Sequence, residues 1–340
     1  MKEEPDREPP LRVGIACNIK QDHASDAQAE FDEPETVAAI RQALEEDGCE
    51  TVLLEASQDF PRALAAQRPD IVFNIAEGRA GRNREAQVPA ICEYYGVPYT
   101  GSDAATLSIA LDKSLTKQLA AARGVATPAS FVLEKGSETL PEGLVYPILV
   151  KPNAEGSSKG ISDACVAKDE AALRALVHRD MAVYAEDLLA EQYIDGREFT
   201  VGILGNGADM RVFAPMEIVY RKLRGEFKVY SFEVKRNYKE HISYSCPPDL
   251  PPDVLARMTR DAAAVYRALG CLDFARIDFR LSPDNTVYFI EANPLPGLAP
   301  GYSDYPMLAA FNGMDYGELV RSVFRCALER CGMKAVRSHE

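Results

Sequence analysis

Apolar and polar positions follow two different rhythms along the first hundred residues. Short apolar runs predict three strands, at residues 11–18, 50–56 and 69–75. Helical spacing of apolar residues predicts helices at residues 34–47, between the second and third strands, and at 85–96. The first helix has Pro34 in its first turn and Gly48 after its end, which is the usual placement of both residues. This alternation of strands and helices predicts a small parallel sheet.

From residue 102 the pattern changes to longer helical segments and paired strands. Helices are expected at residues 102–123, 168–179, 253–269 and 315–332. Strands are expected at residues 130–133, 146–150, 163–167, 190–194, 197–205 and 210–219. Asn206 and Gly207, between the last two strands, are a hairpin turn signal. Residues 220–247 are mostly polar and are expected to form a loop.

A second hairpin carries the most informative side chains. The turn SPDN separates two alternating segments, RIDFR and FIEAN. Residues two apart in a strand face the same side, so Arg276 shares a face with Asp278, and Glu291 shares one with Asn293. The alternatives are a solvated hairpin face and a metal site. The flanking positions are apolar, so the face is expected to be half buried, where charges need partners. Oxygen ligands suit a Mg²⁺ ion that also holds phosphates, and we favour the metal site.

Composition excludes several classes of protein. The 340 residues are 46% apolar and 26% charged, as in ordinary globular proteins of two or three domains. A net charge of −14 argues against a nucleic-acid partner, because a phosphate backbone requires a basic face. No apolar run approaches a membrane span, and the acidic, Pro-rich start suits neither a signal nor a transit peptide. Eight scattered cysteines without a Cys-x-x-Cys pair indicate buried thiols in a cytoplasmic, reducing compartment.

The segment EGSSKG, at residues 155–160, is a candidate phosphate loop. Gly156 and a second glycine free the backbone so that its N–H groups can surround an anion, and Ser157 and Ser158 add hydroxyl donors. Such loops are usually connectors, and Lys151 alone is typical of a strand end. The two features together favour a phosphate site. The lysine precedes the glycines, so the loop is not of the Walker A type.

Taken together, these segments resemble the ATP-grasp superfamily and, within it, the D-alanine–D-alanine ligase-like family. The resemblance extends over residues 70–325, in the segments QVPAICEYYGVPYTGS, LDKSLTK, ILVKPNAEGSSKG, AEQYIDGREFTV, SFEVKRNY with YSCPPDL, ARIDFR and FIEANPLPG. It implies an α/β, three-domain ATP-grasp fold, with a small parallel-sheet N-terminal domain and two α+β lobes that clasp ATP. The implied domains are residues 11–101, 102–190 and 191–340, the last with the metal site.

The resemblance also implies an ATP site. Its residues are Lys113, Lys151, Glu155, Gly156, Ser157, Ser158, Glu191, Gln192, Tyr193, Ile194, Glu198 and Lys235. Lys113 and Lys151 correspond to the pair on the α- and β-phosphates, and Lys235 corresponds to the catalytic lysine on the γ-phosphate. Glu191 corresponds to the side chain of the adenine hinge, whose backbone part is the three residues after it. Glu198 corresponds to the ribose ligand, and the two serines correspond to caps over the phosphates.

The same resemblance implies the chemistry of the hairpin. Asp278, Glu291 and Asn293 correspond to the ligands of two Mg²⁺ ions, for which Mn²⁺ can substitute. Arg276 and the backbone N–H of Gly297 correspond to the clamp on the oxyanion. The implied activity is an ATP-dependent carboxylate–amine ligase. It forms an amide or dipeptide bond by way of an acyl phosphate and releases ADP and phosphate.

Two other functions remain open. One is an authentic D-alanine–D-alanine ligase of peptidoglycan synthesis. The other is a nucleotide-binding protein without catalysis, against which the retained Arg276 argues, because a binding module needs no oxyanion clamp. The expected partners are small carboxylates and amines such as amino acids, with no nucleic acid and no membrane. The chain is expected to act as a monomer or a homodimer.

The first-substrate end departs from the family pattern. The first strand lacks the family's Gly-Gly-x-Ser. Glu33 or Glu35 either replaces the family's amine-binding glutamate or merely faces the start of a helix. Glu77 stands where the family has histidine, and it calls for a donor or a cation on the substrate unless a nearby arginine pairs with it. The arginines that follow either hold a carboxylate or lie in a solvated loop: Arg79, Arg82 and Arg84.

The second-substrate end departs as well. Tyr302 stands where the family often carries small hydroxyl residues for the second substrate's carboxylate, and Ser303 follows one place later. The ATP half of the pattern is therefore intact while both substrate ends are altered. We expect that D-alanine is not the preferred first substrate.

Overall fold

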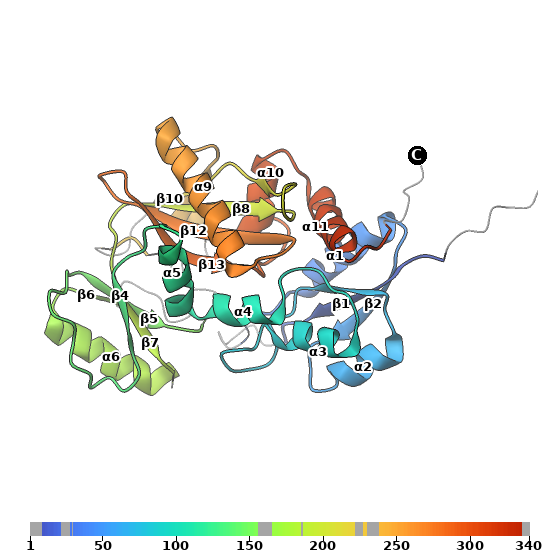
Figure 1. Ribbon diagram of the computed structural model, residues 1–340, viewed down its shortest axis with the longest axis horizontal. Helices are drawn as coiled ribbons and strands as arrows, with labels where there is room; N and C mark the ends of the chain where they lie inside the picture. The colour runs from blue at the N-terminus through green and yellow to red at the C-terminus, as the bar shows by residue number, and fades with distance from the viewer. Residues whose placement is uncertain are drawn as a thin grey trace, which may run out of the picture.

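The computed structural model describes residues 9–21, 28, 30–155, 165–184, 186–221, 227–229 and 238–334. The chain folds into three lobes, each built around its own sheet (Figure 1). One sheet is small and parallel and the other two are antiparallel, which confirms the predicted α/β fold with two α+β lobes. Four of the predicted site residues lie outside the described residues: Gly156, Ser157, Ser158 and Lys235.

The N-terminal lobe is built on the parallel sheet. Its strands are β1 (Arg12–Cys17), β2 (Glu50–Glu55) and β3 (Ile71–Asn74), in the order β2-β1-β3. Its helices are α1 (Pro34–Glu46), α2 (Phe60–Gln67) and α3 (Gln87–Tyr95). The middle strand β1 is buried from its second residue onward, as expected for a parallel strand that is covered on both faces.

The central lobe is a four-stranded antiparallel sheet with one long helix. Its strands are β4 (Ser130–Leu133), β5 (Ile148–Pro152), β6 (Val166–Ala167) and β7 (Leu188–Gln192), in the order β4-β7-β5-β6. The helix α6 (Glu170–Tyr184) packs on this sheet through Leu173 and Val177. The strand β7 begins and ends two residues earlier than expected, and it lies on both sides of the expected domain boundary at residues 190–191.

The C-terminal lobe contains the largest sheet. Its strands are β8 (Arg197–Leu204), β9 (Arg211–Val212), β10 (Met216–Tyr220), β11 (Ile242–Ser245), β12 (Phe274–Leu281) and β13 (Val287–Asn293). Its helices are α8 (Tyr238–His241), α9 (Pro252–Leu269), α10 (Asp304–Phe311) and α11 (Tyr316–Arg330). Val201 and Ile203 of β8 pack with α9 on one face. On the other face, a Cβ on Gly202 would lie 2.7 Å from Leu308 of α10, so only glycine fits there.

Three elements differ from the expectation. The stretch at residues 220–247 is not wholly a loop, because β11 pairs with β10 at the edge of the sheet. The helix α10 was not expected from the loop-like segment before it. The helical stretch after residue 102 is divided into α4 (Ala104–Leu111) and α5 (Lys113–Ala122). The side chain of Asp112 caps α5 by accepting from Leu115 N at 3.1 Å, which starts a new helix there.

The N- and C-terminal lobes share one apolar core. The helix α1 packs against α11 (Figure 1). Side chains of both helices belong to a single buried cluster. The fully buried Asp273 joins the same lobes, because its carboxylate accepts from Gly101 N at 2.8 Å and from Arg330 Nη2 at 2.9 Å. These contacts fix the N-terminal lobe beside the large sheet.

The cysteines are free thiols at all eight positions, and five of them are buried. Among the described residues, no helix is both long enough and apolar enough to cross a membrane.

Candidate active site

The second hairpin forms as its turn signal predicts, but a β-bulge shifts the register by one residue between Asp278 and Phe279. Arg276 of β12 lies opposite Asn293 of β13, and Asp278 lies opposite Glu291. The Arg276 guanidinium contacts Asp278 twice, with Nε–Oδ1 at 3.1 Å and Nη2–Oδ2 at 2.9 Å. Asn293 Nδ2 donates to Asp278 Oδ2 at 3.0 Å. The four polar residues therefore form one group, which we call the hairpin cluster.

The two carboxylates of the hairpin cluster have different surroundings. Burial raises the pKa of Asp278 to about 6, although Arg276 opposes this effect. Burial also acts to raise the pKa of Glu291, but Lys113 and Lys151 outweigh it and the pKa lies below its usual value. Within the described residues, the Glu291 carboxylate accepts no hydrogen bond. An ionised carboxylate without a donor is a suitable ligand for a hard cation.

The donor set fits a Mg²⁺ ion that is shared with phosphates. It consists of two carboxylates and one amide, and Mg²⁺ beside a nucleotide commonly uses only one or two protein carboxylates. In the described part of the chain, no group of three or more His, Cys, Asp or Glu residues is arranged to hold a metal by itself. The hairpin cluster is therefore suited to an ion that takes further oxygen ligands from a substrate.

A buried ion-pair network lies at the end of the central sheet. Glu191 of β7 lies between two lysines, with Lys151 Nζ at 2.6 Å and Lys117 Nζ at 2.7 Å. All three side chains are 3% exposed. Burial alone would raise the pKa of Glu191, but the two lysines bring it down to about 2. Lys117 was not among the predicted site residues, although it lies one helical turn after Lys113 in LDKSLTK, on the same helix face.

Lys113 connects the central lobe to the hairpin cluster. It begins α5, and its Nζ donates to the backbone carbonyl of Glu155, at the start of the predicted phosphate loop. Burial lowers the pKa of Lys113, while Glu291 acts to raise it. Lys113, Lys151 and Glu291 are thus close enough to affect one another, and the structure brings together two lysines and a carboxylate from separate segments.

The predicted adenine hinge is ordered by backbone bonds. Gln192 N donates to Ala129 O at 2.8 Å and Tyr193 N donates to Pro147 O at 2.9 Å. The N–H of Ile194 donates to no group among the described residues, so it remains available to a base. Glu198 lies on β8, where its Oε2 accepts from the Tyr220 hydroxyl at 2.7 Å.

Four acidic residues surround Arg84 near the start of the phosphate loop. The Arg84 guanidinium lies 3.1 Å from Glu30 and 3.6 Å from Glu155. Burial raises the pKa of Glu77 well above its usual value, and both Glu30 and Glu85 add to this shift. Burial likewise raises the pKa of Glu85 to about 7. The region that replaces the family's histidine therefore places several acidic residues around one buried arginine.

The other residues predicted for the first-substrate end have different surroundings. Arg84 is buried, so the solvated-loop alternative does not apply to it. Arg82 is 60% exposed and pairs with Asp112 at 3.0 Å. Glu33 lies 3.4 Å from Lys20 and Glu35 is exposed. The residue that contacts Arg84 from the segment between β1 and α1 is Glu30. No local sequence pattern predicted this contact.

The second-substrate end is formed by the loop before α10. Gly297 is exposed, and its N–H donates to no group in the described part of the chain. A Cβ at this position would lie 2.8 Å from Ser303 Oγ, so a side chain there would displace Ser303. Tyr302 is 42% exposed. Asp304, which was not among the predicted site residues, is buried and lies 3.4 Å from Arg276.

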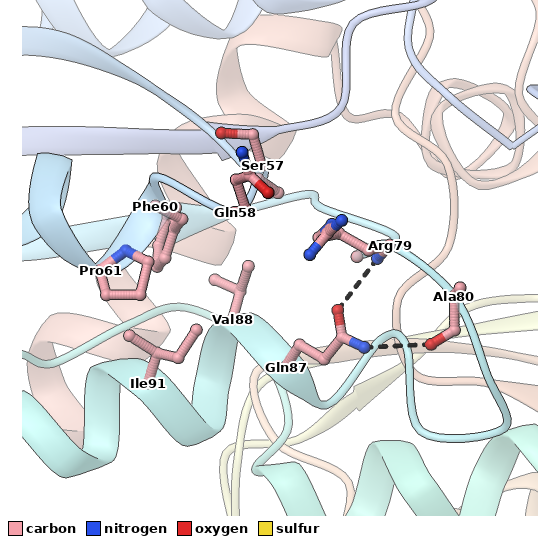
Figure 2. A pocket seen from close by; sticks show the side chains of 11 residues that line it. Ser57, Gln58, Phe60, Pro61, Arg79, Ala80, Gln87, Val88 and Ile91 are labelled. Carbon is pink, nitrogen blue, oxygen red and sulfur yellow. Dashed lines mark hydrogen bonds between the residues drawn. The ribbon is translucent and has the colours of Figure 1, made fainter.

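Arg79 lines a separate hollow on the N-terminal lobe. Figure 2 shows this pocket between α2 and α3. The side chain of Gln87 accepts a hydrogen bond from Arg79 N at 3.0 Å and donates one to Ala80 O at 3.1 Å, which orders the loop at the pocket. Its volume is about 520 Å³. Its lining contains no residue of the hairpin cluster: Ala56, Ser57, Gln58, Phe60, Pro61, Gly78, Arg79, Ala80, Gln87, Val88 and Ile91.

Comparison with solved structures identifies the fold. The crystal structure of D-alanine–D-alanine ligase from Bacillus anthracis complexed with ATP superposes with a TM-score of 0.74 at 23% identity, covering 94% of this chain and 98% of that one. The crystal structure of the VanG D-Ala:D-Ser ligase from Enterococcus faecalis gives a TM-score of 0.69 at 17% identity, covering 94% and 99%. The protein therefore has the ATP-grasp fold.

Sequence comparison identifies the family. The family described as "D-ala D-ala ligase C-terminus" matches residues 125–325. The chain is 37% identical over 286 residues to a protein named D-alanine–D-alanine ligase from Bordetella petrii, covering 84% of each chain. The chain belongs to the D-alanine–D-alanine ligase family.

Proposed function

We propose that the protein is an ATP-dependent ligase that joins a carboxylate to an amine and releases ADP and phosphate. The observation that carries this proposal is the hairpin cluster, in which Arg276, Asp278, Glu291 and Asn293 lie on one face near Lys113 and Lys151. Phosphoryl transfer to a carboxylate depends on charge neutralisation and positioning more than on covalent catalysis, and this arrangement supplies both.

Each group of site residues has its own role in the proposed reaction. Lys113 and Lys151 neutralise the α- and β-phosphates of ATP, and the free N–H of Ile194 binds adenine. Asp278, Glu291 and Asn293 would hold Mg²⁺, which supplies further neutralisation of the transferred phosphate when bound. The donors of the oxyanion clamp are already in place before the amine attacks the acyl phosphate, which is the condition for electrostatic catalysis. The proposed roles of Ser157, Ser158 and Lys235 concern residues outside the described part of the chain.

The substrates are proposed to be amino acids or similar small molecules, as the names of the relatives suggest. We propose that the first substrate is not D-alanine, because Glu77 is buried near Glu30 and Glu85, which raises its pKa, and a donor or a cation on the substrate would compensate for this. The authentic D-alanine–D-alanine ligase is the alternative. It is favoured by relatives that carry this name.

The decisive experiment is a measurement of ADP release with purified protein, ATP and Mg²⁺. D-alanine alone is compared with a panel of amino acids that includes larger and amine-bearing members, and products are identified by mass spectrometry. Amide formation with any pair supports the ligase, and a highest kcat/KM for a cationic first substrate supports the altered pocket. Highest kcat/KM for D-alanine, with D-alanyl-D-alanine as product, would establish the alternative. Nucleotide binding without turnover on the whole panel would favour the non-catalytic protein.

The setting of this activity is proposed to be the cytoplasm. The eight free thiols support a reducing compartment. The protein is proposed to act as a monomer or a homodimer, which sedimentation at several concentrations would distinguish.

A further inference from the structure

Arg280 is a buried guanidinium to which the proposed phosphoryl transfer gives no role. It lies on β12, on the same face as Arg276 and Asp278, because residues two apart in a strand point to the same side. Its side chain is only 10% exposed. Burying a charge to this extent is costly unless the surroundings compensate for it, so the partners of Arg280 are informative.

The guanidinium of Arg280 connects three parts of the predicted nucleotide site. Nη1 donates to the backbone carbonyl of Ile194, in the hinge, at 2.7 Å. Nη2 donates to Glu198 Oε2 at 3.0 Å and also to the backbone carbonyl of Lys228. The guanidinium carbon lies 5.1 Å from the centre of the Tyr193 ring, which is also part of the hinge. Only arginine has enough donors, in a fixed plane, to serve all these groups at once.

The contacts that the described residues make with the Glu198 carboxylate involve only one of its two oxygens. Both of its contacts, from Arg280 and from the Tyr220 hydroxyl, are made to Oε2. In the described part of the chain, Oε1 accepts no hydrogen bond. Glu198 also lies directly opposite Arg280 in the pairing of β8 with β12, so the backbone register fixes both residues. The free oxygen is therefore held in a defined position next to the hinge.

We propose that Arg280 is a positioning residue that fixes the hinge carbonyl of Ile194 and the carboxylate of Glu198, and so sets the selectivity of the site for the ribose hydroxyls of its nucleotide. This inference rests on the proposed use of ATP. Arg280 does not touch the reacting atoms. It acts on the nucleotide through Glu198, whose free oxygen accepts a hydrogen bond from a ribose hydroxyl, and through Ile194, whose own N–H remains available to the base.

The test compares the binding of ADP, 2′-deoxyADP and 3′-deoxyADP to the full-length protein with Mg²⁺ by titration calorimetry. The unmodified protein is expected to bind ADP on the order of tenfold more tightly than at least one of the deoxy analogues, the effect of one hydrogen bond to a charged group. Arg280→Met is expected to weaken ADP binding by roughly tenfold to a hundredfold and to bring the three affinities within about threefold of one another. Arg280→Lys keeps the charge but loses the planar set of donors, and it is expected to lose the same preference.

The matched control is Arg197→Met, which removes another ion-paired arginine of the same sheet. Arg197 binds Glu217 at 2.6 Å and lies outside the nucleotide site. The substitution Arg197→Met is expected to leave the affinities for ADP and both deoxy analogues unchanged. Thermal unfolding establishes whether each variant is folded. If Arg280→Met does not fold, the comparison is made with Arg280→Lys instead.

Two results would overturn the role of Arg280 while leaving the ligase intact. One is a folded Arg280 variant that keeps the full preference for ADP, and the other is an unmodified protein that binds all three nucleotides equally. Failure of the unmodified protein to bind ADP at all would overturn the proposed function together with this inference.

Discussion

At the scale of single residues, Arg276 is held by two carboxylates. It contacts Asp278 in the proposed metal site and Asp304 at the start of α10. Arg276→Met keeps much of the packing of the stem and removes the charge that the oxyanion requires. We expect kcat to fall on the order of a hundredfold or more, with little change in nucleotide affinity. Steady-state ADP release and calorimetry measure the two effects separately.

Arg276→Met also leaves Asp304 without its guanidinium partner, and Asp304 is only 2% exposed. Some loss of stability is therefore expected, and Arg276→Lys serves as the control because it keeps a cation beside both carboxylates. A variant that loses nucleotide binding but keeps kcat would place Arg276 in the nucleotide site rather than at the oxyanion.

Glu291 is the residue whose replacement tests the metal site most directly. Glu291→Gln preserves the shape of the side chain but removes the negative charge that would bind Mg²⁺. We expect turnover to be abolished, because charge neutralisation of the phosphates is lost, while the fold stays intact. ADP release at saturating Mg²⁺ is the measurement. Glu50→Gln, an exposed glutamate on β2, is the control, and near-normal turnover of Glu291→Gln would refute the metal assignment.

At the scale of elements, the loop from β3 to α3 depends on one glycine. Gly78 has φ +77°, and a Cβ there would lie 1.9 Å from the carbonyl oxygen of Arg84. We expect Gly78→Ala to lower the free energy of unfolding by about 3 kcal/mol or more, because the backbone conformation is unfavourable for alanine and the loop must also move. Urea unfolding measures this change.

Gly81 of the same loop provides the matched control. It has φ +90°, but a Cβ there would have nothing within 4 Å. Gly81→Ala is expected to cost only about 1–2 kcal/mol, the strain of the backbone alone. Equal effects of the two substitutions would show that the close approach to Arg84 does not hold this loop.

At the scale of the whole molecule, several buried carboxyl groups make stability depend on pH. Burial raises the pKa of Asp32, Glu85 and Glu186 to about 7 in each case. Between about pH 4 and 7 the folded chain therefore binds more protons than the unfolded chain. The free energy of unfolding of the ligand-free protein is expected to fall as the pH rises through this window, by about 2 kcal/mol or more in total. Urea unfolding from pH 5 to pH 8 measures this dependence.

Glu191 provides the internal contrast for this prediction. Its pKa of about 2 places its titration below the window, so it contributes nothing to the change between pH 5 and pH 8. Glu85→Gln should flatten the pH dependence, because it removes one of the titrating groups. A stability that rises across the window would contradict the raised pKa values of these buried carboxyl groups.

The sequence by itself determined the features that depend on neighbours along the chain. The turn SPDN and the alternation around it predict the hairpin, and the register of β12 and β13 confirms that Arg276 and Asp278 share a face. The parallel sheet of the N-terminal lobe follows in the same way, from helices and strands that alternate at short spacing. In both cases the side-chain period and the turn residues act over a few positions, so local physics is sufficient for the strands and the turn. The β-bulge that places Glu291 opposite Asp278 was found only in the structure.

Only the tertiary structure decided which distant charges meet. Lys117 and Glu191 are 74 positions apart, Arg280 and Glu198 are 82 apart, and Glu30 and Arg84 are 54 apart. None of these pairs has a local pattern, because each side chain alone is typical of a solvated position. Burial is what makes them significant: when lobes pack, a charge that leaves water must find an opposite charge or a donor, and the packing of the sheets selects which one.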